Sequence, residues 1–154
     1  MENPQTLSLM QHALLEAKTA FSLGEVPIGA IVVRQGEIIA TAHNLVESRK
    51  DIAAHAEILA LQRAAQVVGD WRLEICDMYV TLEPCAMCAQ AISYARIRRL
   101  YFGAYNPKGG GVEHGARIFT HPTCLHKPEV IGGVEEKAAQ ALLTKFFGEV
   151  RQEF

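Results

Sequence analysis

The sequence predicts one α/β domain over residues 1–154, a three-layer α/β/α arrangement in which helices pack on both faces of a mixed sheet. Three observations support this. The length of 154 residues suits one ordinary domain. Hydrophobic residues make up 49% and charged residues 21%, as in folded globular proteins. Helical and β-rich segments also alternate along the chain, in the order α-β-β-α-β-α-β-(β)-α.

The first helix and a hairpin occupy the N-terminal part of the sequence. The apolar positions of the helix are spaced alternately by three and four residues: Leu7, Met10, Leu14, Ala17 and Phe21. Gly24 and Pro27 end this helix because neither residue favours its continuation. Two apolar strands, residues 28–33 and 38–42, then flank a turn that contains Gly36.

The middle of the sequence continues with a helix, a strand and another helix. Apolar residues return to helical spacing over about residues 53–68, and Gly69 ends that helix. Residues 78–82 are rich in β-formers and predict a short strand. Pro84 follows and suits the start of a new helix over about residues 85–94.

The last third holds less regular structure. Residues 100–102 predict a short strand, followed by a loop over 103–115 with three consecutive glycines. Residues 130–131 suggest a last strand. A final helix over about 135–150 carries an apolar face formed by Ala138, Leu142, Phe146 and Val150.

Composition and charge exclude several classes of protein. A net charge of −2 excludes a wholly basic protein that coats nucleic acid. No window approaches the length of a membrane helix, and the first residues lack the pattern of a signal peptide. We therefore expect no membrane association and a cytoplasmic location. There thiols stay reduced, so the four cysteines are metal ligands, catalytic or inert.

The residues that carry chemistry lie in two fragments, His55-Ala56-Glu57 and Pro84-Cys85-Ala86-Met87-Cys88. Cys85 and Cys88 at the start of a helix can present two thiolates to one metal, favoured there by the helix dipole. Zinc needs a third protein ligand, which we expect to be His55 at the start of the other helix, with a fourth position left for water. Glu57 would stand beside this metal without ligating it, placed to move protons.

Each fragment alone has an ordinary explanation. An isolated C-x-x-C in a reduced compartment can bind metal, perform redox chemistry or simply pack. An isolated His-x-Glu is usually just two helix residues. Together, however, H-x-E followed by P-C-x-x-C is the established signature of zinc nucleobase deaminases. In that chemistry zinc lowers the pKa of bound water to about 7, and the glutamate transfers the protons.

The chain resembles the cytidine deaminase-like superfamily and, more narrowly, the bacterial tRNA-specific adenosine deaminases. The stretches that carry this resemblance cover most of the sequence: Glu25–Ala30, His43-Asn44, Ala54–Glu57, Tyr79–Cys88, Phe102–Ala104 and Phe146-Phe147. The resemblance implies a five-stranded sheet with helices on both faces, a homodimer and one Zn²⁺ per chain. It also implies conversion of adenosine to inosine at the wobble position of a tRNA anticodon.

The resemblance assigns substrate contacts as well. Asn44 occupies the base-contacting position after the second strand, and its amide can both donate and accept. Ala56 and Pro84 would offer groups beside the metal ligands. Glu25 is a further candidate for substrate binding, against the alternative of a solvated loop charge. Glu83, in contrast, is expected to be structural.

A basic block could hold phosphates. Residues 96–127 contain six Lys/Arg, Lys108 among them, and only one acidic residue, a net charge of +5. The alternative is an ordinary solvated face. Asn106 is a further substrate-binding candidate, although relatives usually have Asp there, and the C-terminal residues lack the basic tail of many relatives.

Two other functions remain open at this stage. A deaminase of a free base or nucleoside, such as guanine or cytosine, would share the zinc site. A non-catalytic RNA-binding or redox C-x-x-C protein would need neither His55 nor Glu57 in register. Cys76 and Cys124 are predicted to be packing thiols, and the spacing of the later histidines does not support a second metal site.

Overall fold

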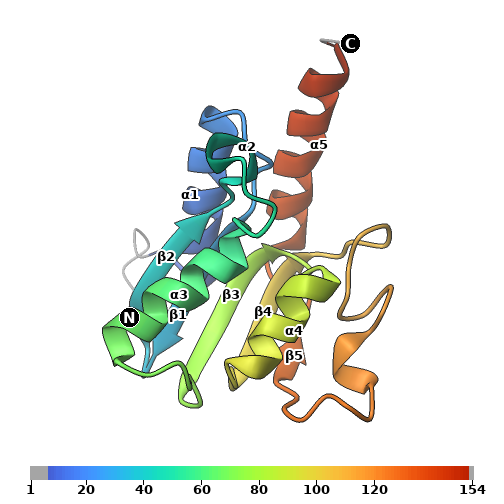
Figure 1. Ribbon diagram of the computed structural model, residues 1–154. Coiled ribbons are helices and arrows are strands. Elements are labelled where there is room, and N and C mark those ends of the chain that lie inside the picture. The colour runs from blue at the N-terminus through green and yellow to red at the C-terminus, as the bar shows by residue number, and fades with distance from the viewer. Residues whose placement is uncertain (1–6, 153–154) are drawn as a thin grey trace, which may run out of the picture.

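The computed structural model describes residues 7–152, with side chains described as far as Glu149. A five-stranded mixed sheet lies between two helical layers, which confirms the predicted fold class (Figure 1). Residues 1–6 and 153–154 of the predicted domain lie outside the described residues. The elements are α1 (Leu9–Ser22), β1 (Gly29–Arg34), β2 (Glu37–His43), α2 (Val46–Arg49), α3 (Ala56–Val68), β3 (Cys76–Leu82), α4 (Ala86–Tyr94), β4 (Arg99–Ala104), the 3₁₀ turn η1 (Ile118–Thr120), β5 (Glu129–Ile131) and α5 (Glu136–Gln152).

The sheet has the strand order β2-β1-β3-β4-β5. β1 pairs antiparallel with both β2 and β3, whereas β3, β4 and β5 run parallel to one another. A parallel pair requires a crossover connection, and α4 provides it between β3 and β4. Consequently α4 starts at the carboxyl end of β3, beside the start of α3 (Figure 1).

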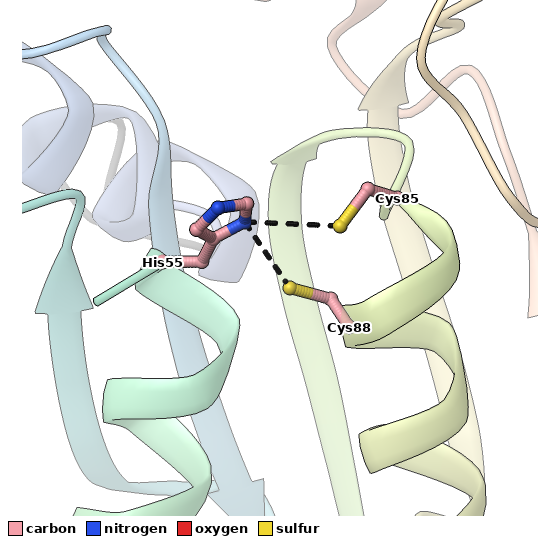
Figure 2. Close-up of side chains that lie close together, drawn as sticks. All are labelled: His55, Cys85 and Cys88. Carbon is pink, nitrogen blue, oxygen red and sulfur yellow. Dashed lines mark hydrogen bonds between the residues drawn. The ribbon is translucent and has the colours of Figure 1, made fainter. Parts of the chain in front are cut away.

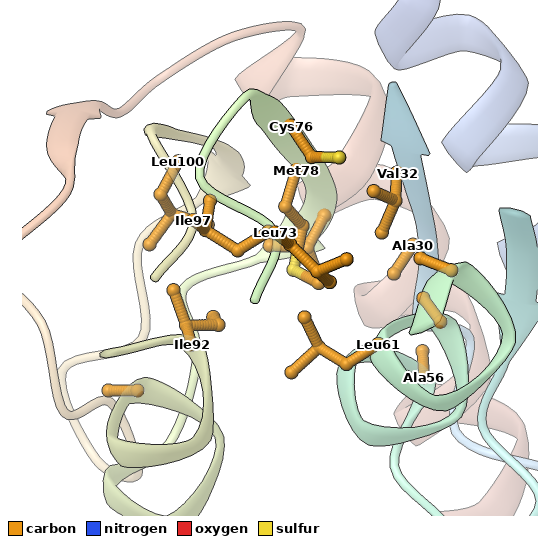
Figure 3. Close-up of a cluster of buried hydrophobic side chains, with 14 of the residues drawn as sticks. Ala30, Val32, Ala56, Leu61, Leu73, Cys76, Met78, Ile92, Ile97 and Leu100 are labelled. Atoms are coloured by element: carbon orange, nitrogen blue, oxygen red, sulfur yellow. The ribbon is translucent and has the colours of Figure 1, made fainter. Parts of the chain in front are cut away.

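The core is divided by the sheet into two clusters. Val32 of β1 faces the cluster beneath α3 and α4, where Leu61, Met78 and Ile92 also lie (Figure 3). Its neighbour Ile31 faces the cluster beneath α1 and α5. Because successive strand side chains point to opposite faces and both faces of β1 are covered, residues 29–33 are all apolar, and only Arg34 at the end of the strand is charged.

The first helix begins later than the sequence pattern predicts. Ser8 is the N-cap: its hydroxyl accepts from the Gln11 N–H at 3.2 Å, and the Gln11 side chain accepts from the Ser8 N–H at 2.8 Å. This reciprocal capping box fixes the start of α1 at Leu9. Leu7, predicted as part of the helical stripe, therefore precedes the helix.

The apolar face of α5 is displaced by about one residue from the predicted one. Ala139 and Leu143 are buried, whereas Ala138 is exposed. Gly103 of β4 has no side chain, and Ala139 occupies the space beside it. Leu142 and Phe146 are half-buried, and the side chain of Val150 lies outside the described residues.

Two short elements have no signal in the sequence pattern. α2 spans four residues and η1 three, too few for a hydrophobic period to appear. Between residues 7 and 152, none of the helices combines the length and the apolarity that crossing a bilayer demands.

Gly29 allows α1 to pack closely on β1. A Cβ there would lie 2.6 Å from the Ala17 backbone nitrogen, within the backbone of α1. We therefore expect Gly29→Ala to reduce the free energy of unfolding by about 1–3 kcal/mol through overpacking. Gly148→Ala is the control, since a Cβ there meets nothing within 4 Å and helix propensity favours alanine by about 1 kcal/mol. Urea denaturation checks both, and equal stability of the two variants would contradict the prediction.

Candidate active site

The predicted metal ligands lie at the starts of α3 and α4. His55 is the N-cap residue of α3 and Cys85 the N-cap residue of α4, while Cys88 lies in the first turn of α4. Serine, threonine, aspartate or asparagine usually occupies an N-cap and bonds the helix backbone. Neither His55 nor Cys85 makes such a bond. The imidazole nitrogen of His55 and the sulfur of Cys85 are therefore not used to cap their helices and can ligate a metal.

The structure brings the three predicted ligands together (Figure 2). His55 Nδ1 lies 3.7 Å from Cys85 Sγ and 3.4 Å from Cys88 Sγ. The ligand atoms of all three residues lie within 4.8 Å of one another. Within the described part of the chain, no other His, Cys, Asp or Glu residues form such a group of three or more.

Hydrogen bonding among these residues shifts their pKa values. The neighbouring Cys88 thiol and His55 lower the pKa of Cys85 to about 4. The proximity of Cys85, together with burial, raises the pKa of Cys88. The bond to Cys85 raises the pKa of His55. One imidazole nitrogen and two sulfurs, one of them readily ionised, are a donor set that suits a tetrahedral Zn²⁺ with one position left open.

Glu57 is a buried carboxylate in the first turn of α3. Its side chain is 3% exposed, and its Oε1 has no hydrogen-bond partner. Burial raises the pKa of Glu57 to about 7. A buried polar atom without a partner is costly, and such atoms mark places where function requires them. An unpaired carboxylate oxygen beside an N/S ligand set is consistent with a site built around a metal and a small polar molecule.

Of three predicted substrate contacts, two are sequence neighbours of the predicted metal ligands and the third, Asn44, follows β2. Asn44 follows β2 and is buried, and its side chain makes no hydrogen bond with the described residues. Ala56 is the first residue of α3, directly after His55. Pro84 is buried, and its carbonyl accepts from the Gly111 N–H at 2.8 Å. The Pro84 carbonyl is thus bonded within the protein, while the Asn44 amide is available to a ligand.

Glu25 has a different role from the predicted substrate contact and from the alternative of a solvated charge. It is fully buried, and its oxygens accept from the backbone N–H groups of Glu47 at 3.0 Å and Ser48 at 2.6 Å. The Ser48 hydroxyl also donates to it. These bonds lower the pKa of Glu25 despite the opposing effect of burial. Glu25 therefore caps α2, whose own N-cap residue makes no side-chain cap.

Asn106 and Lys108 lie on the loop after β4. The Asn106 carbonyl oxygen Oδ1 accepts from the Gly109 N–H at 3.0 Å, which tightens the turn around the exposed Lys108. Both residues border a groove between this loop and α5, where Tyr105 and Phe147 also lie. The structure thus groups them beside an apolar groove rather than at the metal ligands.

Half of the predicted basic block is neutralised by neighbouring carboxylates. Salt bridges join Arg96 to Glu74 at 3.1 Å, Arg98 to Asp77 at 2.8 Å and Arg99 to Glu129 at 2.9 Å. For these three arginines the alternative of a solvated, ion-paired face is the better description. The proximity of the acidic partners depends on strand register, which local sequence does not reveal.

The later histidines and Cys124 do not form a second metal site. The ring of His126 bonds the Ile97 carbonyl at 2.7 Å, and the ring of His121 bonds the Ala116 carbonyl at 2.6 Å. Cys124 is buried and lies 3.3 Å from the Ser93 hydroxyl. These side chains are occupied with separate local contacts, as the spacing indicates.

Glu83, for which a structural role is predicted, is a buried acceptor of hydrogen bonds. The carboxylate is 1% exposed and accepts N–H groups from the loop after β4. These bonds and His114 lower the pKa of Glu83 against the opposing effect of burial. The sequence does not reveal which segment supplies the N–H groups that Glu83 accepts, because that segment begins more than 20 residues further along the chain.

Comparisons with known proteins find similarity to deaminases over most of the chain. The sequence profile of the MafB19-like deaminase family matches residues 5–148. A tRNA-specific adenosine deaminase of Agrobacterium fabrum is 51% identical over 142 residues, covering 92% of this chain and 93% of that protein. Its counterpart in Bacillus subtilis is 46% identical over 143 residues, covering 93% and 89%.

A solved structure shows the same similarity in three dimensions. It comes from a biochemical and structural study of A-to-I editing by tRNA:A34 deaminases at the wobble position of transfer RNA. The TM-score is 0.86 and the sequence identity 51%, with 87% of this chain and 97% of that chain covered.

The ligand geometry predicts how metal content responds to substitution. Cys88→Ser and Cys85→Ser should each lower the zinc content of protein purified without added metal, with a lower melting temperature, because zinc binding stabilises the folded state. Cys124→Ser is the matched control, a buried cysteine outside the cluster. Elemental analysis and thermal unfolding measure both effects. Full zinc occupancy in the Cys85 and Cys88 variants would refute the assignment of ligands.

Proposed function

The chain belongs to the deaminase family that includes the bacterial tRNA-specific adenosine deaminases, and from this premise we propose that it hydrolyses adenosine to inosine at the wobble position of a tRNA anticodon. The observation that carries the proposal is the convergence of His55, Cys85 and Cys88 beside a buried glutamate with an unpaired oxygen. Neither a redox C-x-x-C protein nor a simple RNA-binding module needs that glutamate.

We propose that His55, Cys85 and Cys88 hold one Zn²⁺ per chain. Their nitrogen and two sulfurs match the ligand preference of zinc and leave one position for water or substrate. When bound, zinc supplies a water that can lose a proton near pH 7. The starts of α3 and α4 fix the three ligands on separate rigid helices, which favours a constant geometry.

Glu57 is the proton carrier in this proposal. The reaction adds water at the ring carbon, replaces the exocyclic amino group by a carbonyl and releases ammonia. The Glu57 carboxylate accepts one proton from the water and passes it to a ring nitrogen. It then carries the proton of the added hydroxyl group to the exocyclic amino group, which leaves as ammonia while the carbonyl forms. A pKa raised to about 7 suits a group that must both accept and donate protons near neutral pH.

The remaining contacts select the substrate. The buried Asn44 amide can bond a purine edge, and Ala56 and Pro84 lie next to the ligands His55 and Cys85. Asn106 and Lys108 border the groove beside α5, where a ribose-phosphate chain would find a cation. An anticodon loop offers an unstacked base at low cost.

We also propose that the protein is a cytoplasmic homodimer. A groove between α3 and α4 carries large apolar side chains that are exposed in one chain: Trp71 is 53% exposed, Tyr94 70% and Leu125 97%. Apolar groups that gather on one surface in this way mark an interaction site. A tRNA substrate places the activity in the cytoplasm, where the free cysteines remain reduced.

The experiment that tests the function is incubation with a tRNA that has adenosine at the wobble position. Sequencing should report A-to-G conversion at that position and at no other adenosine. Ammonia release from free guanine and cytosine is measured in parallel. Absence of conversion together with rapid ammonia release from a free base would establish the small-base deaminase instead.

Glu57→Gln separates proton transfer from metal binding. Glutamine keeps the size of the side chain but cannot accept the proton, so turnover should fall by at least about 10²-fold while zinc content and fold persist. Glu37→Gln changes an exposed carboxylate and serves as control. Single-turnover conversion of the same tRNA, with elemental analysis, measures both. A Glu57→Gln protein with undiminished turnover would remove Glu57 from the mechanism.

A further inference from the structure

Glu83 receives five hydrogen bonds from one loop. Its Oε1 accepts from the Asn106 N–H at 3.1 Å and from the His114 ring at 2.8 Å. Its Oε2 accepts from the backbone N–H groups of Val112 at 3.2 Å, Glu113 at 2.9 Å and His114 at 3.1 Å. The carboxylate is almost completely buried and is bonded to both ends of the segment 106–114.

The same segment packs directly on the metal-ligand loop. The Gly111 N–H donates to the Pro84 carbonyl at 2.8 Å, one residue before the ligand Cys85. A Cβ at Gly111 would lie 2.5 Å from the Ala86 nitrogen, and a Cβ at Gly110 would lie 2.6 Å from the Glu83 carboxyl carbon. Gly110 and Gly111 therefore let the loop backbone lie against Glu83 and the start of α4, respectively.

The loop also carries groups that face the substrate groove. The Asn106 backbone N–H donates to Glu83, and the Asn106 side-chain oxygen accepts from the Gly109 N–H in the turn around Lys108. Both residues border the groove beside α5. Because Glu83 is two residues before Cys85 in the chain, its hydrogen bonds tie the loop that carries Lys108 to the segment that carries Cys85.

We infer that Glu83 is a positioning residue for the RNA substrate: its carboxylate holds residues 106–114 so that Asn106 and Lys108 face the nucleic-acid backbone at a fixed distance from the metal site. The inference rests on the proposed function. Glu83 touches neither substrate nor metal in this role. It acts through the loop, and its effect falls on substrate binding more than on chemistry.

Glu83→Gln is the informative change. Both carboxylate oxygens accept N–H groups, and an amide can offer an oxygen to only one set. The other set would face an NH₂ group, donor against donor. The segment 106–114 should detach from the ligand loop while the sheet and α3 remain folded.

The expected result has two parts. Hydrogen exchange of the Asn106, Val112, Glu113 and His114 amides should accelerate at least about tenfold, without change in the β3 amides, and zinc content should stay stoichiometric. KM for the adenosine-wobble tRNA should rise at least about fivefold, with kcat altered less than about twofold. Glu113→Gln is the matched control, because the Glu113 side chain is exposed on the same loop.

The exchange rates test whether Glu83 anchors the loop, and KM tests whether this anchoring positions the substrate. Unchanged exchange at the four amides overturns the anchoring by Glu83. Accelerated exchange with unchanged KM, or a loss confined to kcat, overturns the positioning role. If Glu83→Gln does not fold, His114→Ala removes only the ring donor, and it must show the same KM-selective change at smaller size. Wild-type protein that converts no tRNA refutes the proposed function, whereas the exchange result still decides the anchoring.

Discussion

The starts of α3 and α4 lie side by side over the end of β3, and the site depends on this coincidence (Figure 2). β3 and β4 run parallel, so the chain must cross over through α4, which then begins where β3 ends. His55 arrives at the same place because it is the N-cap of α3. Two helix dipoles thus favour negative charge at one point, where two sulfurs and a carboxylate gather. Moving either helix by one turn would separate the ligands.

The sequence pattern predicts most of the helices and strands around the site because these elements carry strong local signals. The hydrophobic periods of α1 and α3, the continuous apolar run of β1 and the Pro-Cys start of α4 each depend on residues close in sequence. The grouping of His55, Cys85 and Cys88 is predictable because the spacing of these residues is itself the sequence signature. The start of α1 differs from the predicted one because the Ser8–Gln11 capping box outweighs an apolar residue at position 7.

The unpredicted features depend on residues far apart in the chain. Glu25 caps a helix 22 residues away, and nothing near it in the sequence indicates that partner. The arginines after α4 appear as a basic block until strand pairing places Asp77 and Glu129 beside them. Glu25 and Glu83 share one physical solution: a buried carboxylate organises an irregular segment by accepting several backbone N–H groups. Glu25 orders the segment at the start of α2 in this way, and Glu83 orders the loop after β4.

The acidity of Cys85 exposes the protein to oxidants. Among its four cysteines, Cys85 alone is partly accessible, and its pKa of about 4 keeps it a thiolate at neutral pH. Thiolate character and access are the two properties that select a cysteine for oxidation to sulfenic acid or disulfide. The buried Cys76, with a raised pKa, lacks both. The contacts with Cys88 and His55 that lower the pKa of Cys85 therefore also favour its sulfur, rather than that of Cys76, as the site of oxidation.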